Sequence, residues 1–280
     1  MSVELPEAYI LSQQMNIELV GKEAVSCTLK DCLKLQNLGF ISTYSSDFNK
    51  LFDGKIQTIA SRGNTILVKF DSDMNLLLAP EYGGKILYHT KGSIAPLKFH
   101  LKVCFKDDSA LTVTLTGMGI IQALEDQELK TSYVYRRDFS ATATPLDNKV
   151  FTLERFSKEL SDTRANLKSA LVGKDAVIVG LGNSSFQDII YRAGIHPKRK
   201  ATDLSGGEKQ ELYNSIKWVI QQRIKSGGKY QFTDLYGKRG CYIPAMGPNM
   251  KGKNCIVCGG KVEKLSLGGG QLFCCLNCQH

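Results

Sequence analysis

Two pairs of cysteines near the C-terminus constrain the fold of this 280-residue chain more than any other feature. Cys255 and Cys258 form one Cys-x-x-Cys motif, Cys275 and Cys278 form a second, and 16 residues separate the two motifs. Two turns that each present two thiolates complete a tetrahedral Zn²⁺ shell. Residues 250–280 hold few large apolar side chains, so we expect one structural zinc ion to stabilise a hairpin there. Disulfide bonds are the alternative, which a cytosolic chain disfavours.

Charge is distributed unevenly along the sequence. Residues 1–150 hold 16 Lys and Arg against 17 Asp and Glu, which gives 16 − 17 = −1. Residues 151–280 hold 20 against 10, which gives 20 − 10 = +10. A near-neutral half joined to a strongly basic half is typical of a protein that binds a polyanion such as nucleic acid. Solubilising lysines are the alternative reading of charge alone.

Neither a membrane span nor an export signal is evident. The sequence has no run of 18 apolar residues, and its first residues lack the basic and apolar regions of a secretory signal. We therefore expect a cytoplasmic protein without membrane association, and a monomer is the simplest assembly.

The apolar pattern changes at about residue 150. Before it, β-rich runs are separated by clusters of Asp, Gly and Ser, and an amphipathic stretch at 7–19 predicts an initial helix. The β-rich runs are residues 65–70, 74–80, 97–105 and 110–117. Residues 1–147 are thus predicted to form an N-terminal β-sandwich with a flanking helix.

Helical periodicity dominates residues 151–245. Its longest stretch is 206–227, where Asp203 or Ser205 can cap the helix and Gly227–Gly228 can end it. The fold class is therefore α+β, with a β-sandwich domain at 1–147, a helical domain at 151–245 and the hairpin at 250–280.

Three motifs in the same order resemble one known family. They are "ELPEA" at the N-terminus, "GLGNSSFQDIIYRAGIHPKRK" at 180–200 and the terminal cysteine pairs. Together they resemble the Fpg/Nei family, the formamidopyrimidine-DNA glycosylases and endonuclease VIII enzymes that excise oxidised bases. The resemblance covers essentially the whole chain and implies a helix–two-turn–helix domain, a zinc-finger hairpin, damaged duplex DNA as partner and a nucleoid-associated, prokaryote-like location.

The resemblance implies a phosphate contact at Asn183. The flanking Gly180 and Gly182 let the backbone approach an anion at a helix N-terminus. The basic residues that follow on the same motif, Lys198, Arg199 and Lys200, add salt-sensitive affinity for the DNA backbone. A simple N-cap is the alternative role of Asn183, and both roles are compatible.

The N-terminus departs from the family pattern. Glu4 and Glu7 match the two acids of the family, but Val3 stands where the nucleophilic proline belongs and Ser2 is one extra residue. Trimming of Met1 would leave the Ser2 α-amine as a nucleophile. Glu4 activating a water is the second route, and a purely structural role for both acids, such as capping the first helix, is the third.

Two basic positions of the family are also changed. Asn64 stands where the resemblance places a hairpin lysine, with Arg62 nearby, and Gly270 stands where it places the zinc-finger arginine, with Gln271 nearby. Together with the missing N-terminal proline, these two changes indicate that the usual glycosylase and lyase activity of the family is altered or absent.

The resemblance also implies side chains that fill the space left in the duplex by an everted base and a loop that contacts this base. Met118 is the candidate wedge residue, with a core methionine as the alternative. Tyr236, Lys238 and Arg239 suit a loop that contacts a nucleobase or phosphate, and a solvated loop is equally compatible with them.

Two functions follow from this sequence. The first is a DNA glycosylase, with AP-lyase activity if an amine attacks, in which Ser2, Glu4 and Glu7 form the catalytic set. The second is a binding protein that recognises damaged or bent DNA without cutting it.

Overall fold

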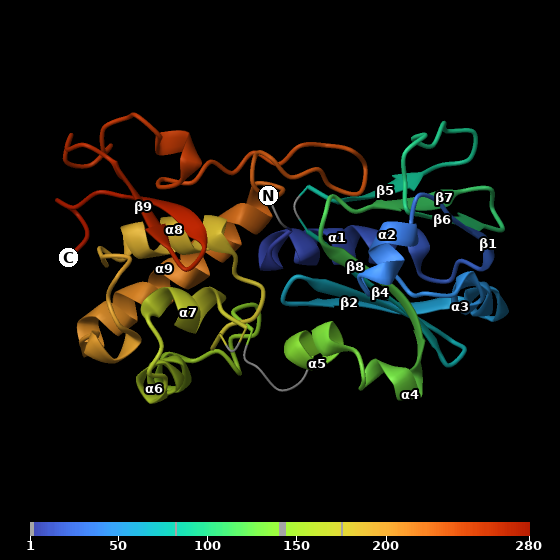
Figure 1. The fold of residues 1–280 in the computed structure, drawn as a ribbon, viewed down its shortest axis with the longest axis horizontal. Coiled ribbons are helices and arrows are strands. Elements are labelled where there is room, and N and C mark those ends of the chain that lie inside the picture. Colours follow the sequence, from blue (N-terminus) through green and yellow to red (C-terminus); the bar gives the residue numbers. More distant parts are fainter. Residues whose placement is uncertain (1–2, 82, 140–143, 175) are drawn as a thin grey trace. The chain divides into compact units, whose positions relative to one another are not determined.

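The computed structural model describes residues 3–81, 83–139, 144–174 and 176–280 (Figure 1). The chain divides into two compact units. The first spans Met1–Ser140 and Gly227–Cys241, and the second spans Ala141–Ser226 and Tyr242–His280. The segment Gly227–Cys241, which the sequence assigned to the helical domain, thus belongs to the first unit.

Two four-stranded antiparallel sheets form the body of the first unit. One sheet has the order β1-β6-β7-β5 and the other β2-β3-β4-β8. The strands of the first sheet are β1 (Ala24–Leu29), β5 (Lys85–His89), β6 (Leu101–Phe105) and β7 (Ala110–Thr114). The strands of the second sheet are β2 (Ile56–Arg62), β3 (Thr65–Phe70), β4 (Met74–Pro80) and β8 (Gly119–Glu125).

The sandwich core follows from alternation in the strands. Strands β6 and β8 alternate buried and partly buried positions, as expected when one sheet face packs on a core. Strand β4 lies between β3 and β8 and is buried at every position, so both of its faces are covered. The turn between β2 and β3 contains Gly63 at φ +58°, and a Cβ there would lie 2.9 Å from Cγ of Asp138. Glycine is therefore needed at this hairpin tip.

Helix α1 (Leu5–Leu19) begins immediately behind the N-terminus and packs against β2 and β3. Its buried face contains Leu5, Leu11, Met15 and Leu19, each at most 1% exposed. The other short helices of this unit are α2 (Leu33–Asn37), α3 (Ser45–Asn49), η1 (Lys50–Asp53), α4 (Asp126–Leu129) and α5 (Tyr133–Phe139).

The second unit is helical and ends in a two-stranded hairpin. Its helices are α6 (Leu153–Asp162), α7 (Leu167–Val172), α8 (Asn183–Arg192), η2 (Ala201–Asp203), α9 (Gly206–Lys225) and η3 (Pro248–Met250). Strands β9 (Glu263–Leu267) and β10 (Gly270–Cys274) form the hairpin, and α8 packs on both α9 and β10. Of the two predicted caps of α9, Ser205 is the one used, and it forms a reciprocal capping box with Glu208.

The predicted fold class is confirmed: two facing sheets with a flanking helix precede a helical unit and its hairpin. Strands β3 and β4 have the predicted bounds, whereas β1, β2, β5 and β8 were not predicted. Within the described residues, no helix combines the length and the hydropathy that crossing a membrane requires.

Candidate functional site

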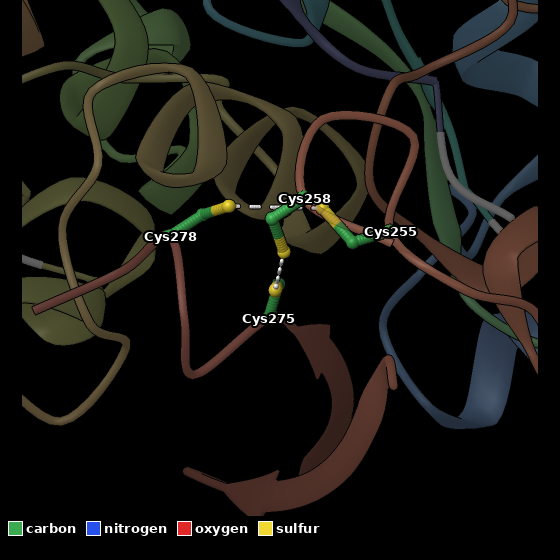
Figure 2. A group of neighbouring side chains, drawn as sticks. All are labelled: Cys255, Cys258, Cys275 and Cys278. Carbon is green, nitrogen blue, oxygen red and sulfur yellow. Dashed lines mark hydrogen bonds between the residues drawn. The ribbon is translucent and has the colours of Figure 1, made fainter. Parts of the chain in front are cut away.

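The four predicted metal ligands converge in the second unit. The sulfur atoms of Cys255, Cys258, Cys275 and Cys278 all lie within 4.8 Å of one another, and Figure 2 shows the side chains meeting from two turns. The Sγ–Sγ distances are 3.4 Å for Cys258–Cys275 and 3.8 Å for Cys255–Cys278. A tetrahedral Zn²⁺ with Zn–S bonds of about 2.3 Å separates its sulfurs by about 3.8 Å. All four are free thiols, so the disulfide alternative does not apply, and the donor set fits a metal ion.

The thiols of this cluster differ in acidity. Burial opposes ionisation of Cys255, but hydrogen bonds from the Tyr191 hydroxyl and from backbone N–H groups lower its pKa to about 6. A hydrogen bond with Cys258, together with burial, raises the pKa of Cys278 to about 12. One thiolate therefore forms readily while its neighbour resists ionisation, an arrangement that a divalent cation among the sulfurs would stabilise.

Asn183 is the first residue of α8 and contacts the hairpin. Its Nδ2 donates to the carbonyl of Gln271 at 2.9 Å, and its Oδ1 is buried without a hydrogen-bond partner. Gln187, one turn later, accepts from the Phe273 N–H at 2.8 Å through its Oε1. Asn183 and Gln271 are 88 positions apart in the sequence, and the fold brings the start of α8 into contact with the hairpin.

Lys168 is a residue of this region that the sequence did not single out. Its Nζ donates to the carbonyls of Leu267 and Gly268 at 2.5 and 3.5 Å. A Cβ added to Gly270 would lie 3.1 Å from this Nζ and 3.7 Å from the amide of Asn183. The Lys168 ammonium thus stands beside the position where the zinc-finger arginine is missing. Burial lowers the pKa of Lys168.

Glu4 and Glu7 are buried in the first unit, 2% and 0% exposed. They form a reciprocal capping box at the start of α1, in which Glu7 Oε2 accepts from the Glu4 N–H at 3.2 Å. The sequence raised helix capping as one of the roles of these acids, and they do cap α1. Ser2, the third predicted catalytic residue, lies outside the described residues.

Asn64 is only 9% exposed, at the tip of the β2–β3 hairpin. Its Oδ1 accepts from the Arg137 guanidinium at 2.6 Å, and its Nδ2 donates to Glu81 at 3.4 Å. Burial opposes the charge of Arg137, but the adjacent Asp138 raises its pKa. A positive charge therefore stands where the hairpin lysine is absent, partly balanced by Asp138. Arg62, the predicted substitute, is the last residue of β2.

The remaining predicted DNA contacts lie on the surface. In the second unit, Lys198, Lys200 and Gln271 are exposed, whereas Arg199 pairs with Glu208 at 2.9 Å. In the first unit, Lys238 and Arg239 are exposed at a tight turn.

Two further predictions concern the first unit. Met118 is 47% exposed, which argues against the alternative of a core methionine. The Tyr236 hydroxyl donates to Glu18 on α1 at 2.9 Å, and the Leu235 carbonyl accepts from the Tyr88 N–H. Hydrogen bonds therefore hold the turn against α1 and β5.

A β-sandwich with two acids at its N-terminal helix, followed by a helical unit with a four-thiol hairpin, defines the class of Fpg-type proteins. A family model described as the formamidopyrimidine-DNA glycosylase H2TH domain matches residues 142–234. A formamidopyrimidine-DNA glycosylase of Pelotomaculum thermopropionicum is 27% identical over 99% of this chain and 98% of its own. One from Streptococcus pneumoniae strain R6 is 24% identical over the same shares of the two chains.

Solved structures show the same fold. The Lactococcus lactis Fpg in complex with DNA containing an abasic site superposes with a TM-score of 0.81 at 22% identity, covering 99% of both chains. A MutM structure with DNA containing carbocyclic 8-oxo-G gives a TM-score of 0.82 at 22% identity, again over 99% of both chains. Residues 142–234 are thus an H2TH domain of the formamidopyrimidine-DNA glycosylase type, and the whole chain is similar to Fpg proteins in sequence and in fold. The chain departs from the Fpg/Nei pattern at its start, where Val3 stands at the position at which the resemblance places a proline.

Proposed function

We propose that this protein binds damaged duplex DNA and excises an everted base by breaking its N-glycosidic bond. The observation that carries the proposal is the pair Glu4 and Glu7, which stay buried and mutually hydrogen-bonded directly behind the altered N-terminus. Burying two carboxylates is costly unless they are paired or put to use. The relatives named above are DNA glycosylases, and two of the similar structures hold DNA with an abasic site or an oxidised guanine analogue.

Two chemical routes are compatible with these residues. In the first, the Ser2 α-amine attacks C1′, the glycosidic bond breaks and the base leaves with a proton. The sugar ring then opens as the C1′–O4′ bond breaks and O4′ takes a proton, and the resulting Schiff base allows β-elimination at the abasic site. In the second, Glu4 accepts a proton from a water whose oxygen adds to C1′, the glycosidic bond breaks and the base leaves with a proton, so no covalent intermediate with the protein forms. Glu4 accepts a proton in both routes, from the attacking amine in the first and from the water in the second, whereas the amine acts only in the first.

DNA binding is assigned to the second unit. Asn183 lies at the N-terminus of α8, a position that favours a phosphate, and Lys168 adds a cation beside it. The exposed Lys198 and Lys200 add non-specific affinity for the DNA backbone. Cys255, Cys258, Cys275 and Cys278 would hold one Zn²⁺, which supplies a structural crosslink for the hairpin rather than chemistry at the base.

The test is incubation of the purified protein with duplex DNA that carries an abasic site or an oxidised base, with and without borohydride. We expect base release that is lost in Glu4→Gln. A trapped adduct that disappears when the Ser2 amine is blocked identifies the amine route, and release without trapping identifies hydrolysis. Tight binding with neither release nor trapping would refute the enzymatic proposal and establish a silent damage-binding protein.

A further inference from the structure

Lys229 is a buried lysine beside the two N-terminal acids. Its side chain is 3% exposed, and its Nζ lies 3.8 Å from Oε1 of Glu4, whose side chain is also 3% exposed. Lysine is almost never fully buried unless its charge is paired. Sequence reasoning could not find this contact, because Lys229 follows Glu4 by 225 positions and no local motif joins them.

Glu7 links the same two segments through its carboxylate. Oε2 accepts from the Glu4 N–H at 3.2 Å, and Oε1 accepts from the Lys229 N–H at 3.1 Å. Both oxygens of Glu7 are therefore bound to backbone N–H groups, one from each segment. This is the geometry of a structural carboxylate. The Glu4 carboxylate also accepts from the Glu7 N–H, but it is the acid that faces the Lys229 ammonium.

The backbone around Lys229 is fixed. Gly227 and Gly228, which precede it, have φ values of +68° and +94°. A Cβ on Gly228 would lie 2.5 Å from the Phe232 ring, and one on Gly240 would lie 2.3 Å from the Gly228 carbonyl oxygen. Only glycine fits at both places, so the chain turns sharply after α9 and delivers the lysine to Glu4 in one position.

We propose that Lys229 is a positioning residue for Glu4, pairing with its carboxylate and orienting it for the excision step. A buried carboxylate without a counter-charge is strongly disfavoured, and the ammonium supplies that charge at a short distance. The segment 227–241 thus takes part in the chemistry of the sandwich unit through this contact. This inference rests on the proposed glycosylase function.

The test compares Lys229→Met with Lys229→Arg in the full-length protein. We expect the methionine variant to lose about 100-fold in single-turnover base release, the scale expected when a catalytic group moves by about 1 Å. Its DNA affinity should change by less than about twofold, because the lysine acts on the reacting step and not on binding. Arginine keeps the charge and should recover the rate to within about tenfold of the native protein. Lys22→Met, which removes the partner of Asp107 in the same unit, is the matched control and should leave the rate unchanged.

Three results would overturn the positioning role. The first is full activity in Lys229→Met. The second is an arginine variant as inactive as the methionine variant, and the third is a borohydride adduct mapped to Lys229. The last two would mean that the amine itself meets the substrate.

A stability measurement keeps this inference separate from the proposed function. A double-mutant cycle of Glu4→Gln and Lys229→Met is measured by urea unfolding. If the two side chains stabilise each other, the double variant should be less destabilised than the two single changes together predict. Its folding constant should be at least about fivefold higher than the value expected from independent effects. Additive effects would refute the pairing even if the native protein excises bases. Coupling in a protein that never releases a base would refute the glycosylase function and keep the contact.

Discussion

Replacing Tyr191 with phenylalanine tests whether one hydrogen bond to Cys255 contributes to metal binding by the four cysteines. The Tyr191 hydroxyl lies 3.1 Å from Sγ of Cys255, and burial together with that thiol raises the pKa of the tyrosine. The hydroxyl therefore keeps its proton and donates to the sulfur. Phenylalanine keeps the ring within its buried cluster with Met246, Val262 and Phe273, so the change removes the donor and little else.

The expected loss follows from the charge of the acceptor. A hydrogen bond to a charged group is worth about 1.5–3 kcal/mol, and loss of an outer partner of a metal ligand typically costs about 10–100-fold in metal affinity. We therefore expect Tyr191→Phe to weaken Zn²⁺ binding by about 10–100-fold at pH 7.

The pH dependence has a definite sign. The lowered pKa of Cys255, about 6, keeps the thiolate available for the metal above that pH, and protons compete as the pH falls through it. Without the donor the pKa moves back toward the ordinary thiol value of 9.0, so competition begins at higher pH. The difference in zinc affinity between variant and native protein should therefore be smallest above the higher value, grow as the pH falls between the two values, and level off near pH 6.

Competition with a chelating dye between pH 6 and 9 measures this effect directly. Tyr213→Phe is the matched control, because the Tyr213 hydroxyl donates to the Phe151 carbonyl at 2.9 Å and its loss should leave zinc affinity unchanged. Equal zinc affinity of Tyr191→Phe and the native protein over this range would refute the reasoning.

Three further outcomes are expected. Asn183→Ala should weaken DNA binding to a similar extent across sequences in a filter or polarisation assay, and a loss confined to one sequence would contradict a phosphate role. Gly270→Arg should raise DNA affinity and steepen its salt dependence by about one phosphate contact, since its backbone lies outside the positive-φ region and its Cβ meets only the end of the Lys168 side chain within 3.4 Å. An unchanged salt slope would argue against this phosphate site. Chelation should unfold residues 250–280 while the sandwich persists, which limited proteolysis will report, and a protected hairpin in excess chelator would contradict a metal-dependent fold.

Local pattern in the sequence determined several of the elements, among them β3 and β4, and the candidate metal site. The spacing of Cys255, Cys258, Cys275 and Cys278 requires two adjacent turns, and the sulfur atoms do converge. Ser205 followed by Glu208 specifies the start of α9 within one turn of helix. Ser205 and Glu208 are close in the chain, and the two cysteine pairs are expected to converge because one metal ion would bind all four thiolates.

Only the tertiary structure decided which charges serve the candidate sites. Lys229 reaches Glu4, Lys168 stands beside Gly270, and Arg137 binds Asn64, each across at least 70 residues of chain. No periodicity or spacing encodes such pairs, because burial and the close approach of distant segments create them. The family motifs show where basic groups are missing, whereas the folded chain shows which other cations stand in those places.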